Sequence, residues 1–231
     1  MKFIRENIAA ISSVLAVLTA VMMALSVYMV FSYAPLERVM GWPQKIFYFH
    51  VPIAIACYIG FFVTFAGSIG YLWTKNIAWD RFAVAGAEVG IVFATLMLLT
   101  GMIWGKPIWG AYWTWDPRLT TSFILWLIFV GYLILRTRVD DEIMRAKYAA
   151  VMGIVGYADV PLVHWSVKLW SRGIHPVLEK TSHDSGMHPD MFTAFQVCLI
   201  SILLLFVLIF IQRVRYEFLK AEVDYLKSAH S

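Results

Sequence analysis

The chain has 231 residues, of which 61% are hydrophobic and 15% charged, and its formal net charge is +4. Soluble globular domains are about 45–50% apolar and about 25% charged, so this composition excludes a soluble enzyme and a disordered chain. The positive charge forms no basic stripe interleaved with aromatic residues, and we expect no nucleic-acid partner. The composition predicts an integral membrane protein, embedded in the lipid bilayer.

Six runs are long and apolar enough to cross a membrane, because about 20 apolar residues span roughly 30 Å of hydrocarbon. Lipid offers no partners for backbone groups, and long runs without alternating polarity must be helices rather than barrel strands. We therefore predict an all-α polytopic membrane protein, a single domain over residues 1–231 that forms a bundle of six transmembrane helices. In chain order, the predicted spans cover residues 8–33, 46–73, 82–104, 120–135, 148–167 and 191–211.

The first run follows Lys2 and Arg5 and exceeds the roughly 7–15 apolar residues of a signal-peptide core, which predicts an uncleaved anchor. Lys and Arg concentrate in cytoplasmic connectors. With the N-terminus inside, 12 of the 19 Lys and Arg residues fall on the inner side. We therefore expect both termini in the cytoplasm, residues 213–231 as a cytoplasmic tail, and residues 105–119 and 168–190 outside. The inner set consists of Lys2, Arg5, Lys75, Arg81, Arg136, Arg138, Arg145, Lys147, Arg213, Arg215, Lys220 and Lys227.

Motifs for common enzyme chemistries are missing from the sequence. There is no phosphate-binding GxxxxGK[ST], no HExxH and no GxSxG, so we expect no enzymatic activity, and any ATP must be hydrolysed by a partner. Cys57 and Cys198 lie in separate apolar runs and are expected to be small apolar filler. The sequence contains neither CxxC nor CxxCH.

The outer segment 105–119 is unusually rich in aromatic residues. If it is helical, Trp109, Tyr112, Trp113 and Asp116 share one face, because they are spaced i, i+3, i+4 and i+7. Trp115 adds a further ring. Such a surface is either a platform for a flat hydrophobic ligand or an interfacial aromatic belt.

The residues around these rings favour a ligand with acidic substituents. Gly110 would let a large molecule approach the backbone closely. Lys106 and Arg118 flank the rings with positive charge. Porphyrin, which is flat, apolar and carries carboxylates, has the matching shape and charge.

Two histidines, His50 and His164, lie at the outer edges of apolar runs. Neutral imidazole is a good iron ligand and the usual proximal ligand of haem, so the pair could hold one iron from both sides. The alternative is an interfacial histidine hydrogen-bonded to a carbonyl or to water. A second cluster in the outer loop is better explained as solvated, although it could bind a divalent metal: His175, His183, Asp184, Met187, His188 and Asp190.

Glu88 and Asp159 are carboxylates inside predicted spans, where charged residues are often functional. Glu88 is close to the predicted inner edge, and Asp159 precedes Pro161 near the outer edge. We expect both to have structural roles, with Asp159 stabilising a local helix break.

Residues 109–116 read WGAYWTWD and are followed by Arg118-Leu-Thr120. This segment resembles the tryptophan-rich WGxxWxWD signature of haem-handling proteins. Over nearly its full length the chain is similar to the family of haem exporter protein C, or cytochrome c maturation protein C. The similarity includes YFHVP at residues 48–52 and PLVHWSV at residues 161–167. Longer relatives that ligate haem to cytochrome share the signature, but this chain is shorter.

The resemblance implies that haem b binds non-covalently and transiently at the periplasmic face of a bacterial inner membrane, with His50 and His164 as axial ligands of the iron. It also implies a periplasmic haem chaperone that receives the haem for cytochrome c maturation. Further partners in a transporter-type complex are an ATPase subunit, a second membrane subunit and a small single-span subunit. The implied haem-binding residues are Trp109, Gly110, Tyr112, Trp113, Trp115, Asp116 and Arg118.

Two other functions fit six helices with paired histidines. A b-type electron-transfer subunit would bury its histidines within the bundle and would cycle electrons with a quinol. A permease subunit for another substrate would line a path with Glu88 and Asp159.

Overall fold

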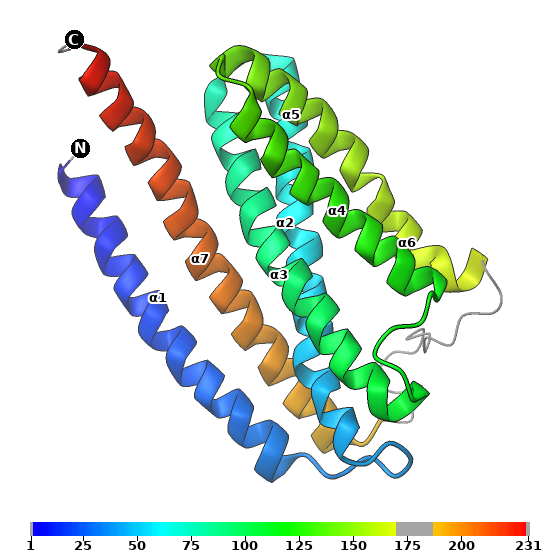
Figure 1. Cartoon of the computed structure of the whole chain (residues 1–231). Helices are drawn as coiled ribbons and strands as arrows, with labels where there is room; N and C mark the ends of the chain where they lie inside the picture. Colours follow the sequence, from blue (N-terminus) through cyan, green and yellow to red (C-terminus); the bar gives the residue numbers. More distant parts are fainter. Residues whose placement is uncertain (1, 170–186, 230–231) are drawn as a thin grey trace.

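The computed structural model describes residues 2–169 and 187–229 (Figure 1). Within these ranges every regular element is helical, and six helical segments are long and apolar enough to cross a membrane, which confirms the predicted all-α membrane fold. A π-helix, Met29–Tyr33, extends the first helix, and a 3-10 turn, Trp42–Ile46, precedes the second. The α-helices are α1 Lys2–Tyr28, α2 Phe47–Thr74, α3 Ile77–Trp109, α4 Pro117–Arg138, α5 Glu142–Tyr157, α6 Asp159–Leu169 and α7 Pro189–Ala229.

Short polar side chains at Asn76 and Asp141 set where two of the helices begin. Asn76 accepts a hydrogen bond from the backbone N–H of Ala78 at 2.9 Å and starts α3 immediately after α2. Asp141 in the same way caps α5 through the N–H of Met144 at 2.7 Å. Side-chain oxygens at this position satisfy N–H groups that the first turn of a helix leaves without partners.

The fifth predicted span is two helices rather than one. α5 ends at Tyr157 and α6 begins at Asp159, with Ala158 between them, and together Glu142–Ser166 has the length and hydropathy of a span. Pro161 lies in the first turn of α6, where a residue without an N–H is tolerated. Asp159 therefore lies at a helix break, as expected from the sequence.

Glycines allow α2 and α3 to pack with their backbones in close contact. A Cβ atom on Gly60 would lie 2.7 Å from the Cα of Gly90, and one on Gly86 would lie 2.8 Å from the carbonyl oxygen of Gly60. Small residues at such positions are typical of membrane helices, whose association depends on close packing rather than on the hydrophobic effect. Beside this contact, Phe61 of α2 stacks on Phe129 of α4, with ring centroids 3.7 Å apart.

A buried ion pair joins α3 to α4 at the end of the bundle that carries the α2–α3 turn. Arg136 donates to both carboxylate oxygens of Asp80, at 2.6 and 2.7 Å, and the side chains are 12% and 6% exposed. Bidentate geometry satisfies both groups, which a buried charge pair requires.

At the opposite end, Lys45 ties the start of α2 to the end of the first helix. Its buried ammonium donates to the carbonyl oxygens of Val30 and Ala34, both at 2.6 Å. Carbonyls at a helix end have no partner within the helix. Lys45 supplies one, and it thereby positions the first turn of α2.

Helix α1 packs along α7, at the edge of the bundle (Figure 1). Their contact includes a hydrogen bond between the hydroxyls of Ser26 and Ser201 at 2.6 Å. The other face of α1 exposes large apolar side chains such as Val14 and Val21, as expected for a helix that faces lipid.

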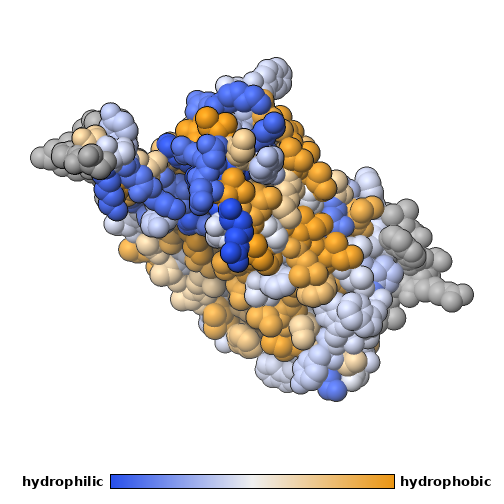
Figure 2. Space-filling model, turned by 45° about the horizontal axis from the view of Figure 1, so that its top comes forward, coloured by the Kyte–Doolittle hydropathy of each residue, from blue (hydrophilic) through white to orange (hydrophobic). Residues whose placement is uncertain are grey.

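Both chain ends lie at the same end of the bundle (Figure 1), which follows from six crossings. Figure 2 shows hydrophilic residues gathered over this end, with hydrophobic residues along the sides. We refer to it as the inner end and to the opposite one as the outer end, in accordance with the charge bias; the cytoplasmic location of the termini stays a prediction. Residues 213–229, predicted as a tail, continue α7 as helix.

We predict that Gly60→Ala lowers the free energy of unfolding by about 1–3 kcal/mol, because the added methyl group meets the backbone of α3, which cannot move aside. Gly131→Ala is the matched control, since its Cβ would meet the flexible end of Met152. Thermal unfolding in detergent measures both variants. Equal stabilities of the two variants would contradict the close α2–α3 packing.

Candidate functional site

The structure brings the two candidate histidines to the outer end. His50 lies in the first turn of α2, and α2 packs antiparallel to α3, which ends at Trp109. His164 lies on α6, where its carbonyl oxygen accepts a hydrogen bond from Arg118 Nη2 at 3.3 Å. Because Arg118 belongs to the first turn of α4, His164 lies beside the segment that joins α3 to α4.

His50 is held against the last turns of α3. Its Nδ1 is 2.9 Å from the hydroxyl oxygen of Thr100. Its ring lies 5.6 Å from the ring of Trp104, measured between centroids. The imidazole lies beside Gly101, where an added Cβ would lie 3.2 Å from its Cε1. The side chain is half-buried.

His164 has a different environment. Its side chain is exposed and makes no hydrogen bond within the described residues, whereas its backbone carbonyl accepts the one from Arg118. The adjacent Val163 is buried and Trp165 is 53% exposed. The outer end thus has one histidine fixed by α3 and one that is accessible.

Residues 109–116 do not form the continuous helix that would place four of them on one face. α3 continues to Trp109 and ends there, because Gly110 adopts a left-handed conformation with φ +75° and donates its N–H to the carbonyl of Lys106 at 3.0 Å. Residues 111–116 are not helical, and Pro117 disfavours helical geometry at the residue before it. Gly110 therefore serves as a helix terminator, a position that favours glycine.

The rings of this segment divide into exposed and half-buried ones. Trp115 is 74% exposed and Tyr112 is 56% exposed. Trp113 is half-buried and packs edge-on against Trp115 and against Phe123 of α4, with centroids 5.7 and 5.9 Å apart. Lys106 lies over the ring of Tyr112 at 5.3 Å. Trp109, also half-buried, ends α3.

Asp116 is a helix cap rather than a displayed carboxylate. Its Oδ1 accepts the N–H of Arg118 at 3.0 Å, and the residue is only 7% exposed. In a helical segment, the spacing would place this carboxylate on the same face as the aromatic rings. In the structure it turns toward α4 and fixes where that helix begins.

Several buried polar atoms of the outer end make no hydrogen bond within the described residues. Three are donors: Trp104 Nε1, Trp113 Nε1 and Arg118 Nε. The buried hydroxyls of Thr114 and Thr120 also make no hydrogen bond within the described residues. Buried donors normally have acceptors, and a carboxylate-bearing ligand supplies them. The residues present therefore fit a haem with its two propionates.

Glu88, at the other end, belongs to an ion-pair network. Arg213 of α7 donates to both of its carboxylate oxygens, and it also lies 2.6 Å from Glu217. The pair ties α7 to α3. This geometry supports the structural role expected of Glu88.

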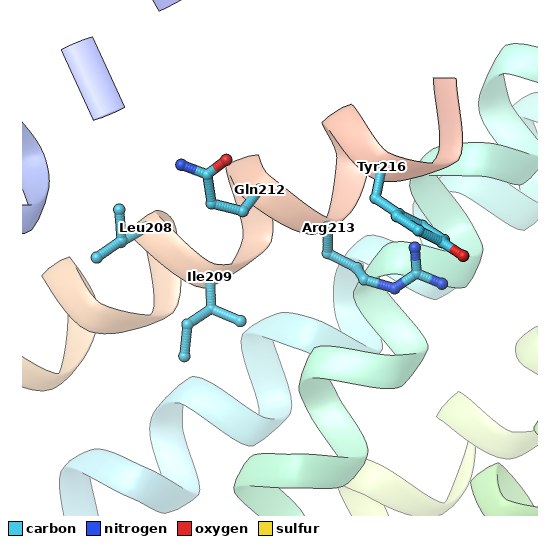
Figure 3. Close-up of a pocket in the computed structure, with 5 residues that line it drawn as sticks. All are labelled: Leu208, Ile209, Gln212, Arg213 and Tyr216. Atoms are coloured by element: carbon cyan, nitrogen blue, oxygen red, sulfur yellow. The ribbon is translucent and has the colours of Figure 1, made fainter. Parts of the chain in front are cut away.

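A hollow of about 830 Å³ lies next to this network, and Figure 3 shows its lining. Arg213 extends beside the ring of Tyr216 there, 4.6 Å from its centroid. All the residues that line it belong to α7, and none is a candidate haem residue: Leu208, Ile209, Gln212, Arg213 and Tyr216.

The remaining candidates gain little support. Of the outer-loop cluster, His175, His183 and Asp184 lie outside the described residues, and His188 lies 3.5 Å from the carboxylate of Asp190. No group of three or more metal-ligating side chains occurs in the described ranges. Cys57 and Cys198 are buried and unbridged, as expected of apolar filler.

Sequence reasoning missed Thr100 and Trp104 as neighbours of His50. Their spacing of four residues places them on one face of α3, which was a usable signal. What the pattern could not show is that this face meets the start of α2.

The chain is similar over most of its length to known proteins. The model of the family described as "Heme exporter protein C" matches residues 2–229. Heme exporter protein C of Bradyrhizobium diazoefficiens is 34% identical over 213 residues, which cover 92% of this chain and 81% of that protein. The protein of the same name from Escherichia coli K12 is 31% identical over 204 residues, 87% of this chain and 81% of that protein. The one from Haemophilus influenzae is 30% identical over 215 residues, covering 92% and 86%.

We predict that Asp116→Ala lowers the free energy of unfolding by about 0.5–2 kcal/mol, the usual cost of losing an N-cap. Asp116→Asn keeps an acceptor oxygen and should retain most of the stability. Thermal unfolding in detergent compares the two variants with the unmodified protein. An alanine variant as stable as the parent would refute the capping role.

Proposed function

We propose, on the premise that this chain belongs to the heme exporter protein C family, that it binds haem b at the periplasmic face of the bacterial inner membrane and presents it to a haem chaperone. Membership itself supports a role in haem handling for cytochrome c maturation. Haem is here a transient, non-covalent cargo. The observation that carries the finer proposal is that both histidines lie at the same end of the bundle as buried donors that have no acceptor among the described residues.

In this proposal His50 and His164 are the axial ligands of the haem iron. Histidine nitrogen is a common axial ligand of haem, and the two residues come from different helices at the same end. Haem supplies the iron and the flat apolar surface. The residues of this chain hold it, orient it and shield it from water.

The aromatic segment and its cations have separate roles. The half-buried rings of Trp109 and Trp113 cover the macrocycle. Arg118 pairs with a propionate, because its Nε is a buried donor that lacks an acceptor within the described residues. Lys106, engaged with Gly110 and Tyr112, stands at the edge of the same segment.

The exposed rings of Trp115 and Tyr112 form the contact for the chaperone. Exposed aromatic residues are enriched in interfaces with partner proteins. Any energy from ATP comes from an ATPase subunit, which acts with a second membrane subunit and a small single-span subunit, since no ATP-binding motif occurs in this chain.

We predict that His50→Ala and His164→Ala each lower the haem content of the purified protein, because each removes one bond to the iron. His188→Ala is the control, an exposed histidine of the same outer end. Haem is measured as its pyridine complex. Unchanged haem content in the double variant of His50 and His164 would refute the ligand assignment.

We also predict that Trp115→Ala slows haem transfer to the chaperone and leaves haem content unchanged, since this ring is 74% exposed. Trp73→Ala is the matched control, because Trp73 is 86% exposed at the inner end of α2. Transfer is followed by the appearance of covalently bound haem on the chaperone. Equal transfer rates in the two variants would show that the exposed ring of Trp115 does not contribute to the contact with the chaperone.

A further inference from the structure

The hydrogen bonds of Thr100 determine whether Thr100 or His50 donates the proton in the hydrogen bond between them. The Thr100 hydroxyl oxygen is 2.7 Å from the carbonyl oxygen of Leu96 and 3.2 Å from that of Met97. A threonine within a helix donates its one proton to such a carbonyl. The hydroxyl therefore has only lone pairs to offer to His50 Nδ1, 2.9 Å away.

This arrangement assigns the tautomer of His50. Since Thr100 accepts, Nδ1 carries the proton and donates, and the lone pair of the neutral ring is on Nε2. The ring lies beside Gly101 of α3, where an added Cβ would come within 3.2 Å of Cε1. Trp104 lies against the imidazole from one turn further along α3.

We propose that Thr100 is a positioning residue for haem binding, which accepts the Nδ1 proton of His50 and thereby presents Nε2 as the iron ligand. The inference rests on the proposed function, in which His50 is an axial ligand. Hydrogen bonds of this kind fix ligand orientation and raise ligand basicity, and their loss typically lowers metal affinity 10–100-fold.

The two histidines then have unequal roles. His50 is oriented before haem arrives, whereas the exposed side chain of His164 makes no hydrogen bond within the described residues. Preorganisation reduces the entropy lost on binding. His50 is therefore the firmly held ligand and His164 the one that exchanges as haem enters and leaves.

Thr100→Val tests this proposal, because valine keeps the branched shape and removes the acceptor. We expect haem affinity to fall about 10–100-fold, measured from the rate of haem loss to apomyoglobin. The reduction potential of the bound haem should become more positive, because a less basic imidazole stabilises the ferric iron less. Thr100→Ser keeps the hydroxyl and should restore both values.

Thr193→Val is the matched control, since it removes an outer-end hydroxyl of α7 that donates to the carbonyl of Pro189 at 3.1 Å. Size-exclusion chromatography and circular dichroism in detergent establish that each variant folds. If the valine variant does not fold, Thr100→Ala replaces it in the same comparison.

The outcomes separate this inference from the function on which it rests. Wild-type affinity and potential in Thr100→Val, or a serine variant as weak as the valine variant, would overturn the positioning role. If His50→Ala binds haem as tightly as the parent protein does, the ligand assignment itself fails. If His50→Ala loses haem and Thr100→Val does not, the proposed function still holds and only the positioning role of Thr100 is refuted.

Discussion

The close contact between α2 and α3 is the constraint on which the rest of the molecule depends. Gly60, Gly86 and Gly90 bring the two backbones together, where any side chain would hold them apart. The same antiparallel pair brings the start of α2 to the last turns of α3, and so places His50 against Thr100. The packing of the spans and the geometry of the proposed ligand thus have one physical cause.

The outer end also depends on the segment that joins α3 to α4, whose conformation is set by the residues at its two ends. Gly110 ends α3 and Asp116 begins α4, so the rings between them are displayed by an irregular segment and not by a helix. This lets Trp113 turn inward while Trp115 stays exposed. A single helical face could not cover a ligand and meet a partner with neighbouring residues in this way.

Charges inside the apolar spans belong mainly to the framework. Asp80 pairs with Arg136, and Glu88 with Arg213, each across two helices of the bundle. Both pairs lie toward the inner end, away from the histidines. Among the described residues, most of the buried polar atoms that make no hydrogen bond lie instead at the outer end, including those of Trp104, Trp113 and Arg118. This division separates groups that hold the bundle together from groups available to a ligand.

The sequence by itself determined the six spans, the all-α class and the family, because hydropathy over some 20 residues and the motif at residues 109–116 are local properties of the chain. It could not decide whether that motif is helical, since the left-handed turn at Gly110 depends on one backbone angle that spacing does not reveal. Only the tertiary structure decided which side chains surround His50. Thr100 and Trp104 are about 50 residues away in the chain, and a contact at that separation depends on how two helices pack.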